Sequence, residues 1–312
     1  MEKQAEKYNL RQTYIEELIR LAEINPRIVS LDSDSKEATF ADRFLMAYPE
    51  RSFTFGIAEQ DMVSAAAGMA TMGLIPFVNS YALFIAMRAL DQLRNSVAYP
   101  NLNVKFVLSH HGLDSGADGI THQLTEDIAI FRSIPNLKML QPADAIEMRQ
   151  MVRFAMETDG PVIIKSGKTS VPNFHDENYV WQYGVPSLIM PGTKVALIAT
   201  GIMLDKTLNA HKMLKDEGLD TRLLHFSSFT DLNIAIFLDM IHDIDLIVTV
   251  EDHSIHGGLG GLIAETCSQF KPTRVLRVGL KNQFAECGSP SELFAKYEMD
   301  EQEIVRQVKE NL

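Results

Sequence analysis

One carboxylate stands at a place in the sequence where it could take part in catalysis. Glu59 follows a short apolar run, Phe53–Phe55, and begins a segment rich in alanine and methionine. That segment predicts a buried helix, beside which a carboxylate would be partly desolvated and able to share a proton with a ligand nitrogen. An acidic side chain in a first helical turn also interacts favourably with the helix dipole. Taken alone, Glu59 therefore favours a structural interpretation over a catalytic one.

A glycine-rich loop carries a second group of reactive side chains, namely His110, His111, Asp118 and His122. The loop follows a predicted buried strand, and α/β proteins place their chemistry where such strands end. A solvated loop with scattered histidines is the alternative. The spacing is not that of a zinc site, so we expect no metal ligands here. The pattern favours proton transfer and hydrogen bonding to a polyol or ketol.

Two further patterns have simpler explanations. Tyr81, Phe84 and Met87 recur at helical spacing, which is more typical of a core than of a pocket, although the rings could also pack on a flat heterocycle. The run Gly257–Gly261 matches neither common nucleotide-binding glycine motif and predicts a tight turn with close helix packing. The neighbouring charged and histidine side chains are candidate interface groups: Glu251, Asp252, His253 and His256.

The elements that must position these residues alternate between strand and helix. The alternation predicts an α/β fold of two three-layer domains with mostly parallel sheets. A proline-containing segment with the single tryptophan, Trp181, interrupts it. We therefore expect a first domain over residues 1–170, a linker over 171–191 and a second domain over 192–312. Expected strands are Ile28–Leu31, Phe53–Phe55, Phe77–Asn79, Asn103–Ser109, Leu137–Leu140, Val162–Lys165, Val195–Thr200, Thr221–Phe226, Leu246–Val250 and Arg274–Val278.

Composition narrows the class of protein. The 312 residues carry a formal net charge of −12, which argues against a general nucleic-acid binder. Two cysteines, Cys267 and Cys287, are typical of a reducing compartment. The polar N-terminus is unlike a secretory signal, and the apolar stretch Val195–Leu204 is too short to span a bilayer. We expect a cytoplasmic protein without a membrane partner.

Several segments together resemble one enzyme family, the transketolases and deoxyxylulose phosphate synthases. Phe55–Met62 is similar to the segment that carries the cofactor-activating glutamate, and Asp118–Gln123 is similar to the loop usually written DGxTHQ. Tyr81–Asn95 resembles the aromatic helix of split transketolases. Two more segments, Gln141–Asp144 and Val250–Gly260, look like family segments and keep the same order along the chain.

The resemblance implies a pyrimidine-binding domain followed by a transketolase C-terminal domain, with thiamine diphosphate as cofactor. Glu59 would hydrogen-bond N1′ of the aminopyrimidine and so favour the tautomer whose imine removes the C2 proton. The remaining roles are also implied: cofactor contacts by Ile57, Tyr81, Phe84, Met87 and Asp34, catalysis by His110 and His122 with His110 as proton shuttle, and donor contacts by His110, Asp118, His122, Lys165 and Lys168.

The resemblance also implies a partner. Transketolases hold the diphosphate and its Mg²⁺ in another domain through a GDG motif, and this sequence has no GDG. We therefore expect a separate N-terminal subunit that carries the motif and the Mg²⁺. The expected assembly is an α2β2 heterotetramer in which this chain dimerises.

The substrate remains open among several alternatives. Ala38 stands at the position of a phosphate-binding serine, and Lys165 and Lys168 stand near that of an arginine. A lysine lacks the bidentate fork of arginine, so a sulfonated sugar or an uncharged ketol such as a steroid side chain competes with a sugar phosphate. A 2-oxo acid dehydrogenase beta-type subunit is disfavoured by the Asp118–Gln123 loop. An inactive interaction subunit is disfavoured by the intact set of polar groups.

Overall fold

The computed structural model describes residues 6–312, which divide into two compact units. Unit 1 comprises the described residues up to His111 together with Ile130–Tyr179. Unit 2 comprises Gly112–Ala129 together with Val180–Leu312. The segment Gly112–Ala129 thus interrupts unit 1 in sequence and belongs to unit 2 by its contacts. The domain boundaries expected near residues 170 and 192 stay predictions.

Unit 1 is built on a six-stranded sheet in which every neighbouring pair is parallel, in the order β3-β2-β4-β5-β7-β6. The inner strands are apolar and buried, as expected when helices cover both faces of a parallel sheet. The strands are β2 (Ile28–Asp32), β3 (Ser52–Thr54), β4 (Ile75–Tyr81), β5 (Lys105–Ser109), β6 (Lys138–Leu140) and β7 (Val162–Ser166), with a small antiparallel pair of β1 (Lys7–Tyr8) and β8 (Val171–Pro172).

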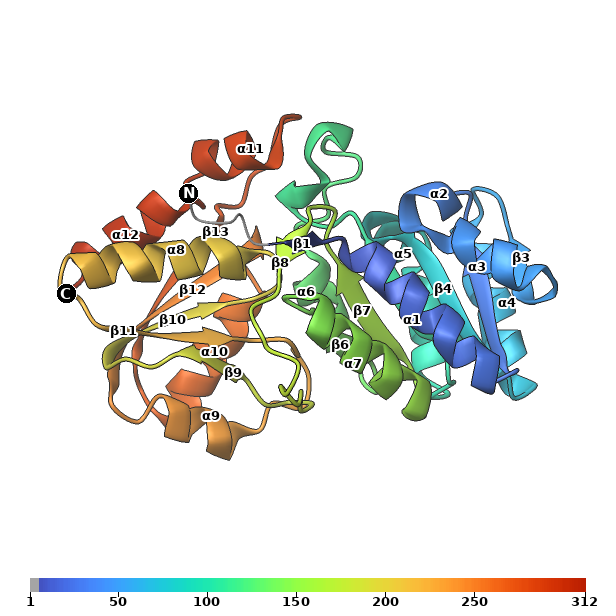
Figure 1. Ribbon diagram of the computed structural model, residues 1–312, viewed down its shortest axis with the longest axis horizontal. Coiled ribbons are helices and arrows are strands. Elements are labelled where there is room, and N and C mark those ends of the chain that lie inside the picture. The colour runs from blue at the N-terminus through green and yellow to red at the C-terminus, as the bar shows by residue number, and fades with distance from the viewer. Residues whose placement is uncertain (1–5) are drawn as a thin grey trace. The chain divides into compact units, whose positions relative to one another are not determined.

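Helices cover this sheet on two faces, as right-handed crossovers between parallel strands require. Helices α1, α3 and α7 lie on one face, and α4 packs with a π-helix on the other (Figure 1). The bounds are α1 (Leu10–Ile24), α2 (Lys36–Thr39), α3 (Ala41–Ala47), a 3-10 turn (Pro49–Arg51), α4 (Glu59–Thr71), α5 (Ala82–Arg88), the π-helix (Gln92–Ala98) and α7 (Ala145–Glu157). Helix α6 (Asp127–Phe131) spans the boundary between the units.

Unit 2 has a five-stranded sheet in the order β13-β12-β10-β11-β9. Four strands are parallel, and the edge strand β9 runs antiparallel to β11. Helices α8 and α12 lie on one face, and α9 and α10 lie on the other (Figure 1). The elements are a 3-10 helix (Leu113–Asp118), β9 (Ser187–Met190), β10 (Lys194–Ala199), α8 (Met203–Asp216), β11 (Thr221–His225), α9 (Ile234–Met240), β12 (Ile244–Ser254), α10 (Leu259–Phe270), β13 (Arg274–Leu280), α11 (Pro290–Lys296) and α12 (Glu301–Lys309).

The fold class expected from the sequence, two α/β domains with mostly parallel sheets, is confirmed. Two local features differ from expectation. The segment Tyr81–Asn95, which resembles a single aromatic helix, is instead divided between α5 and the π-helix. A π-helix is a local widening that is frequent at functional sites. Strand β9 lies within the segment expected to be a linker.

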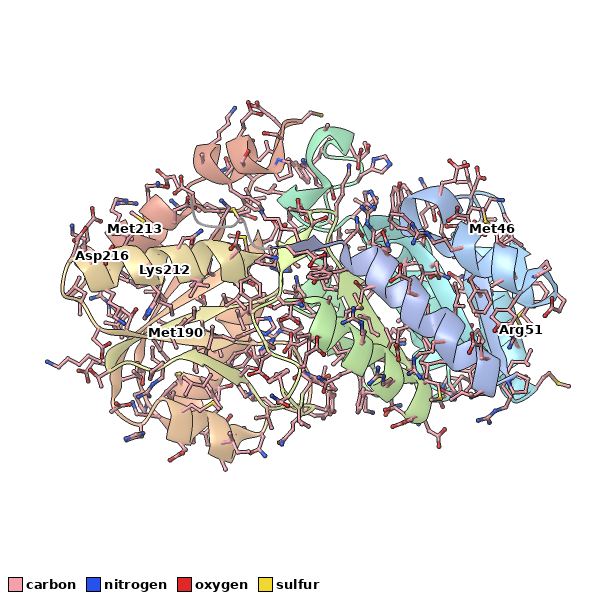
Figure 2. The ribbon with its side chains drawn as sticks, viewed as in Figure 1. Met46, Arg51, Met190, Lys212, Met213 and Asp216 are labelled. Atoms are coloured by element: carbon pink, nitrogen blue, oxygen red, sulfur yellow. The ribbon has the colours of Figure 1, made fainter. Side chains whose placement is uncertain are left out.

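Surface side chains show ordinary packing at the rim of each unit. Arg51 lies 3.8 Å over the ring of Tyr48 and donates to the carbonyl of Ala22, whereas Met46 and Met213 project from exposed helix faces (Figure 2). Over residues 6–312, no helix combines the length and the apolar character needed to cross a membrane. Both cysteines are free thiols, Cys267 buried and Cys287 exposed.

Candidate functional site

Glu59 is the first residue of α4, and its side chain is 2% exposed. The turn before it depends on Gly56, whose φ of +65° lies in the region that favours glycine. Ala58, the residue before the helix, has no side chain that could cap it. The first turn of α4 carries two acidic groups, Glu59 and Asp61, which interact favourably with the positive end of the helix dipole. The chain therefore buries a carboxylate at a helix start that is not capped in the usual way.

Arg88, the last residue of α5, pairs with this carboxylate. Its Nη1 lies 3.3 Å from Glu59 Oε2 and 3.5 Å from Oε1, and its guanidinium lies 4.3 Å from the centre of the Phe84 ring. The arginine side chain is 47% exposed, so solvent weakens the ion pair. The pair nevertheless offsets part of the cost of burying the glutamate. Sequence reasoning missed this residue.

A hollow of about 580 Å³ opens beside the ion pair, lined by Ile57, Ala58, Glu59, Gln60, Asp61, Met87 and Arg88. Ile57 and Met87 are large apolar residues that are nevertheless 75% and 56% exposed. An exposed apolar rim around a buried carboxylate is the composition expected of a site for a flat, partly polar molecule. The lining contains two carboxylates and one guanidinium, so it does not suit a polyanion.

Aromatic rings stack at the carboxyl end of β4. The ring of Tyr81 lies 3.9 Å from that of His110, and 5.5 Å from that of Phe84, both in stacked geometry. His110 is 3% exposed, and its backbone has a φ of +52°. A hydrogen bond of 2.9 Å joins its Nδ1 to Ser109 Oγ. A histidine held in this uncommon backbone conformation is typical of functional sites. The stacking fixes the plane of the imidazole.

The parallel register brings several predicted residues to one edge of the unit 1 sheet. Tyr81, Ser109 and Ser166 are in register and end three adjacent strands. Tyr81 therefore ends the first strand, and His110 and Lys168 lie just beyond the ends of the other two. Lys165 lies inside β7 and is buried, and Lys168 is half-buried. Asp34 follows β2, is exposed, and has a φ of +63°. Ligands of open parallel sheets bind outside this edge.

Asp118 and His122, the other two predicted loop residues, belong to unit 2. Asp118 is exposed, and His122 is half-buried with its Nδ1 3.0 Å from Thr121 Oγ1. The loop folds on itself, since the N–H groups of His122 and Gln123 both donate to the carbonyl of Gly119. The structure therefore groups the predicted residues into two sets: Glu59, Tyr81 and His110 in unit 1, and Asp118 with His122 in unit 2.

The charged residues at the end of β12 correct one expectation. Glu251, Asp252 and His253 are at most 3% exposed within the chain itself, so they are not surface interface groups. Glu251 accepts the N–H groups of Leu259 and Gly260 and so caps α10. The glycine run allows this approach, because a Cβ on Gly258 would lie 2.0 Å from Glu251 Oε2. The predicted tight turn with close helix packing is confirmed.

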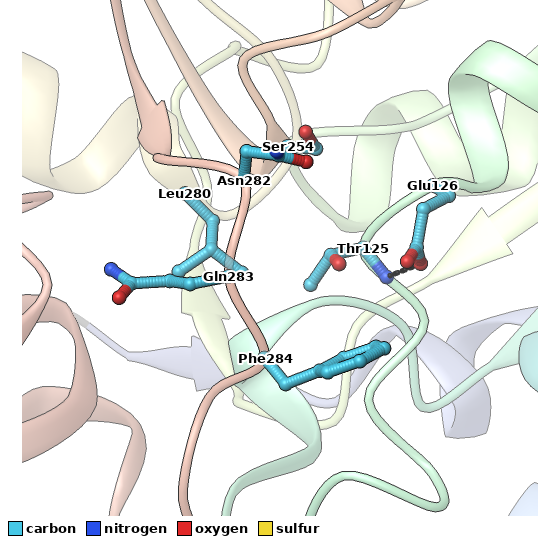
Figure 3. A pocket seen from close by; sticks show the side chains of 7 residues that line it. All are labelled: Thr125, Glu126, Ser254, Leu280, Asn282, Gln283 and Phe284. Carbon is cyan, nitrogen blue, oxygen red and sulfur yellow. Dashed lines mark hydrogen bonds between the residues drawn. The ribbon is translucent and has the colours of Figure 1, made fainter.

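A second, smaller hollow of about 160 Å³ lies in unit 2 (Figure 3). Its walls come from Thr125 and Glu126 on one side, and from Ser254, Leu280 and residues 282–284 on the other. The exposed ring of Phe284 borders it. Among residues 6–312, no group of three or more histidine, cysteine, aspartate or glutamate side chains could hold a metal ion.

Comparison with known proteins decides the family. Residues 6–173 match the model of the transketolase pyrimidine binding domain, and residues 187–304 match that of the transketolase C-terminal domain. The chain belongs to the transketolase family. Membership implies dependence on thiamine diphosphate, the cofactor expected from the sequence.

Several relatives that match this transketolase chain over nearly their whole length are split members of the family. It is 36% identical to a putative transketolase C-terminal section of Methanocaldococcus jannaschii, over 97% of this chain and 96% of the relative. It is 35% identical to a 6-deoxy-6-sulfo-D-fructose transketolase subunit of Clostridium sp. (strain MSTE9), over 96% of this chain and 94% of that relative. A solved structure described as a split gene transketolase, inactive beta4 tetramer, superposes with a TM-score of 0.88 at 37% identity and covers 97% of both chains.

The residues of this transketolase chain fit one half of the cofactor. The buried Glu59 carboxylate borders a hollow with an apolar rim at Ile57 and Met87, a lining that would suit a flat, partly polar ring such as an aminopyrimidine. The same hollow, with two carboxylates and one guanidinium, does not suit a diphosphate. The fit therefore extends to the pyrimidine and ends there.

Proposed function

We propose that this chain is the C-terminal subunit of a thiamine diphosphate-dependent transketolase that transfers a two-carbon ketol unit and works only with a separate diphosphate-binding subunit. One observation carries the proposal: a carboxylate that is 2% exposed borders a hollow with an apolar rim. Glu147, a structural glutamate in the first turn of α7, is equally buried, but its carboxylate accepts the N–H of Ala143 and the hydroxyl of Tyr179. Glu59 instead lies at the wall of a hollow.

Each residue has a definite task in this proposal. When bound, thiamine diphosphate supplies the electron sink that lets the carbon–carbon bond of a ketol break. Glu59 holds a proton at the N1′ atom of the aminopyrimidine. Tyr81, Phe84, Ile57 and Met87 provide apolar surface for the cofactor, and Asp34 is a further, polar contact. His110, whose Nδ1 is engaged by Ser109, moves a proton at the donor through its other ring nitrogen.

Asp118 and His122 bind the donor in the same proposal. A carboxylate and an imidazole offer the acceptor and donor groups that hydroxyl and carbonyl oxygens of a ketol need. His122 also assists proton transfer.

The partner subunit supplies what this chain lacks. The hollow beside Glu59 carries no excess of positive charge, so the diphosphate and its Mg²⁺ are bound by a subunit with the GDG motif. The relatives named above as a section and a subunit support a split enzyme. We propose an α2β2 heterotetramer in which this chain dimerises.

The donor is proposed to end in an anion. Arg11 donates to the carbonyls of Ala38, at 2.7 Å, and Lys168, at 3.2 Å, and so joins the two segments where the family binds a substrate phosphate. Arg11 and Lys168 place two cations there, which favours a phosphorylated or sulfonated ketose over an uncharged one. The expected order of kcat/KM is D-fructose 6-phosphate or 6-deoxy-6-sulfo-D-fructose well above D-fructose. Equal rates for all three would favour an uncharged ketol such as a steroid side chain.

The test of the catalytic role is Glu59→Gln in the complex with the partner subunit. Loss of a positioned acid lowers the rate by about 10²- to 10⁴-fold. The matched control is Glu301→Gln, which removes another first-turn glutamate that is paired with a cation, Lys206, at 3.4 Å. Glu301→Gln should retain normal ketol transfer. Full activity of Glu59→Gln would overturn the proposal.

A further inference from the structure

Asp252, at the end of β12, holds the start of the loop that carries Asp118 and His122. Its carboxylate is 3% exposed. Oδ1 accepts the N–H of Leu113 at 2.7 Å, and Oδ2 accepts the N–H of Asp114 at 3.0 Å. These are the first two residues of the 3-10 helix that ends at Asp118. Hydrogen bonds to an ionised acceptor are about twice as strong as neutral ones, so this is a firm attachment.

The loop is shaped to receive this carboxylate. Gly112 has a φ of +61°, and a Cβ at this position would lie 2.2 Å from Asp252 Oδ2. Any larger residue would therefore push the carboxylate away from the two N–H groups. Gly112 also donates its own N–H to the carbonyl of Leu124 at 2.7 Å, which ties the two ends of the loop together.

The residues that follow Asp252 attach the other end of the loop. The N–H of Ser254 donates to the carbonyl of Thr125 at 2.7 Å, and both residues line the small hollow (Figure 3). His253 Nε2 accepts the N–H of Ala129 at 3.4 Å. Three consecutive strand residues thus hold the loop at its beginning and at its end, with Asp252 as the charged member.

The middle of the loop has its own support. Gln123 Nε2 donates to the carbonyl of Gly116 at 3.2 Å and to that of Glu286 at 3.0 Å. Ser115 Oγ donates to the carbonyl of His122. These bonds link the segment before Asp118 to the segment after it, so a displacement of the Leu113–Asp114 end is transmitted to both Asp118 and His122.

We propose that Asp252 is a positioning residue for donor binding. It fixes the loop whose Asp118 and His122 contact the ketol, and so gives unit 2 a part in substrate recognition. The inference rests on the proposed function, which assigns the donor contacts to these two residues. Fixing a loop before the donor arrives removes an ordering cost from binding. Loss of the attachment therefore weakens donor binding and leaves the pyrimidine side of the site unchanged.

The experiment compares Asp252→Asn and Asp252→Ala with the wild type as full chains and as complexes with the partner subunit. Amide hydrogen exchange of residues 113–118 should accelerate about 10- to 100-fold, because a charge-assisted bond is lost. The KM for D-fructose 6-phosphate or 6-deoxy-6-sulfo-D-fructose, whichever the wild type uses, should rise about tenfold or more on the same grounds. The Kd of the complex for thiamine diphosphate should not change.

Two further variants separate this role from a general loss of stability. Asp300→Ala removes another aspartate of unit 2 that accepts a backbone N–H, that of Glu303 at 3.0 Å, at the start of α12. It should leave loop exchange and donor KM unchanged. Gly112→Ala disturbs the same contact from the loop side and should reproduce the Asp252 effects, which covers the case in which Asp252→Ala does not fold.

The possible outcomes distinguish the positioning role of Asp252 from the proposed transketolase activity. Faster loop exchange with an unchanged donor KM would overturn the inference and leave the proposed transketolase activity in place. Unchanged loop exchange in both Asp252 variants would overturn it as well. No ketol transfer by the wild-type complex would overturn the proposed function, and the inference with it.

Discussion

At the scale of single residues, the ion pair between Glu59 and Arg88 is the feature on which the site depends. The position of Glu59 at a helix start could be predicted, because an apolar strand, a glycine and an alanine-rich run surround it. Its partner could not, since Arg88 lies 29 residues away and continues an ordinary helical pattern. Asp252 was expected to be an interface group, and its contact with the loop could not be predicted either, because its N–H donors lie 139 and 138 residues earlier in the chain.

A double-mutant cycle of Glu59→Gln and Arg88→Ala measures this pair. Arg88→Ala leaves a buried carboxylate without its cation, and because the arginine is 47% exposed we expect a loss of about 1 kcal/mol in the free energy of unfolding. In the Glu59→Gln background the same change should cost little. Urea denaturation of the four proteins gives the coupling energy. Strictly additive changes would show that the two side chains do not interact in solution.

At the scale of elements, the alternation of strand and helix could be predicted, because buried parallel strands give short apolar runs and amphipathic helices give apolar residues at helical spacing. Short elements were not. Strand β9 has four residues, of which only Ser187 is buried, so no alternation marks it within a proline-containing segment. The π-helix keeps the apolar spacing of an α-helix, and only its backbone hydrogen bonds distinguish it.

The N-terminus of α7 shows how one element holds an irregular segment. Asp144 caps the helix at the N–H of Glu147, and its other oxygen accepts the N–H groups of Phe174 and His175 at 2.9 Å. The imidazole of His175 also bonds this carboxylate, at 2.8 Å, and stacks on the ring of Tyr179 at 3.7 Å. Tyr179 donates to Glu147, which closes the network.

This network predicts a pH dependence of stability. Burial alone would lower the pKa of His175, but the hydrogen bond with Asp144 and the charge of Glu147 raise it above 6.5. Burial alone would raise the pKa of Asp144, but the bonds from His175 and the Glu147 backbone lower it below 3.8. The histidine contribution is therefore fully present below about pH 6.5 and lost as the pH rises through the folded-state pKa. The aspartate contribution is lost only in acid.

Thermal unfolding of wild type and His175→Gln between pH 5.5 and 8.5 tests this sign. The wild type should be the more stable protein at pH 5.5, and its advantage should shrink toward pH 8.5. A difference in Tm that stays constant across this range would show that His175 does not change its charge in the network.

At the scale of the whole molecule, each unit contributes a different part of the proposed chemistry. Unit 1 carries the buried glutamate and the stacked rings of Tyr81 and His110, and unit 2 carries the loop with Asp118 and His122. From the order of the sequence alone, the loop that carries Asp118 and His122 would be grouped with the strand before it. Its contacts instead assign it to unit 2, and such contacts with distant residues leave no local pattern in the sequence. The hollow beside Glu59, with two carboxylates and one guanidinium, supports the proposal that another chain binds the diphosphate.

The most direct test of this account is reconstitution. The chain alone, the partner subunit alone and the two together are each supplied with thiamine diphosphate and Mg²⁺, and transfer of a two-carbon unit from D-fructose 6-phosphate or 6-deoxy-6-sulfo-D-fructose to an aldehyde acceptor is followed. We predict transfer only in the mixture, rising with added partner until the two chains are equimolar. Transfer by the chain alone at the rate of the mixture would contradict the account.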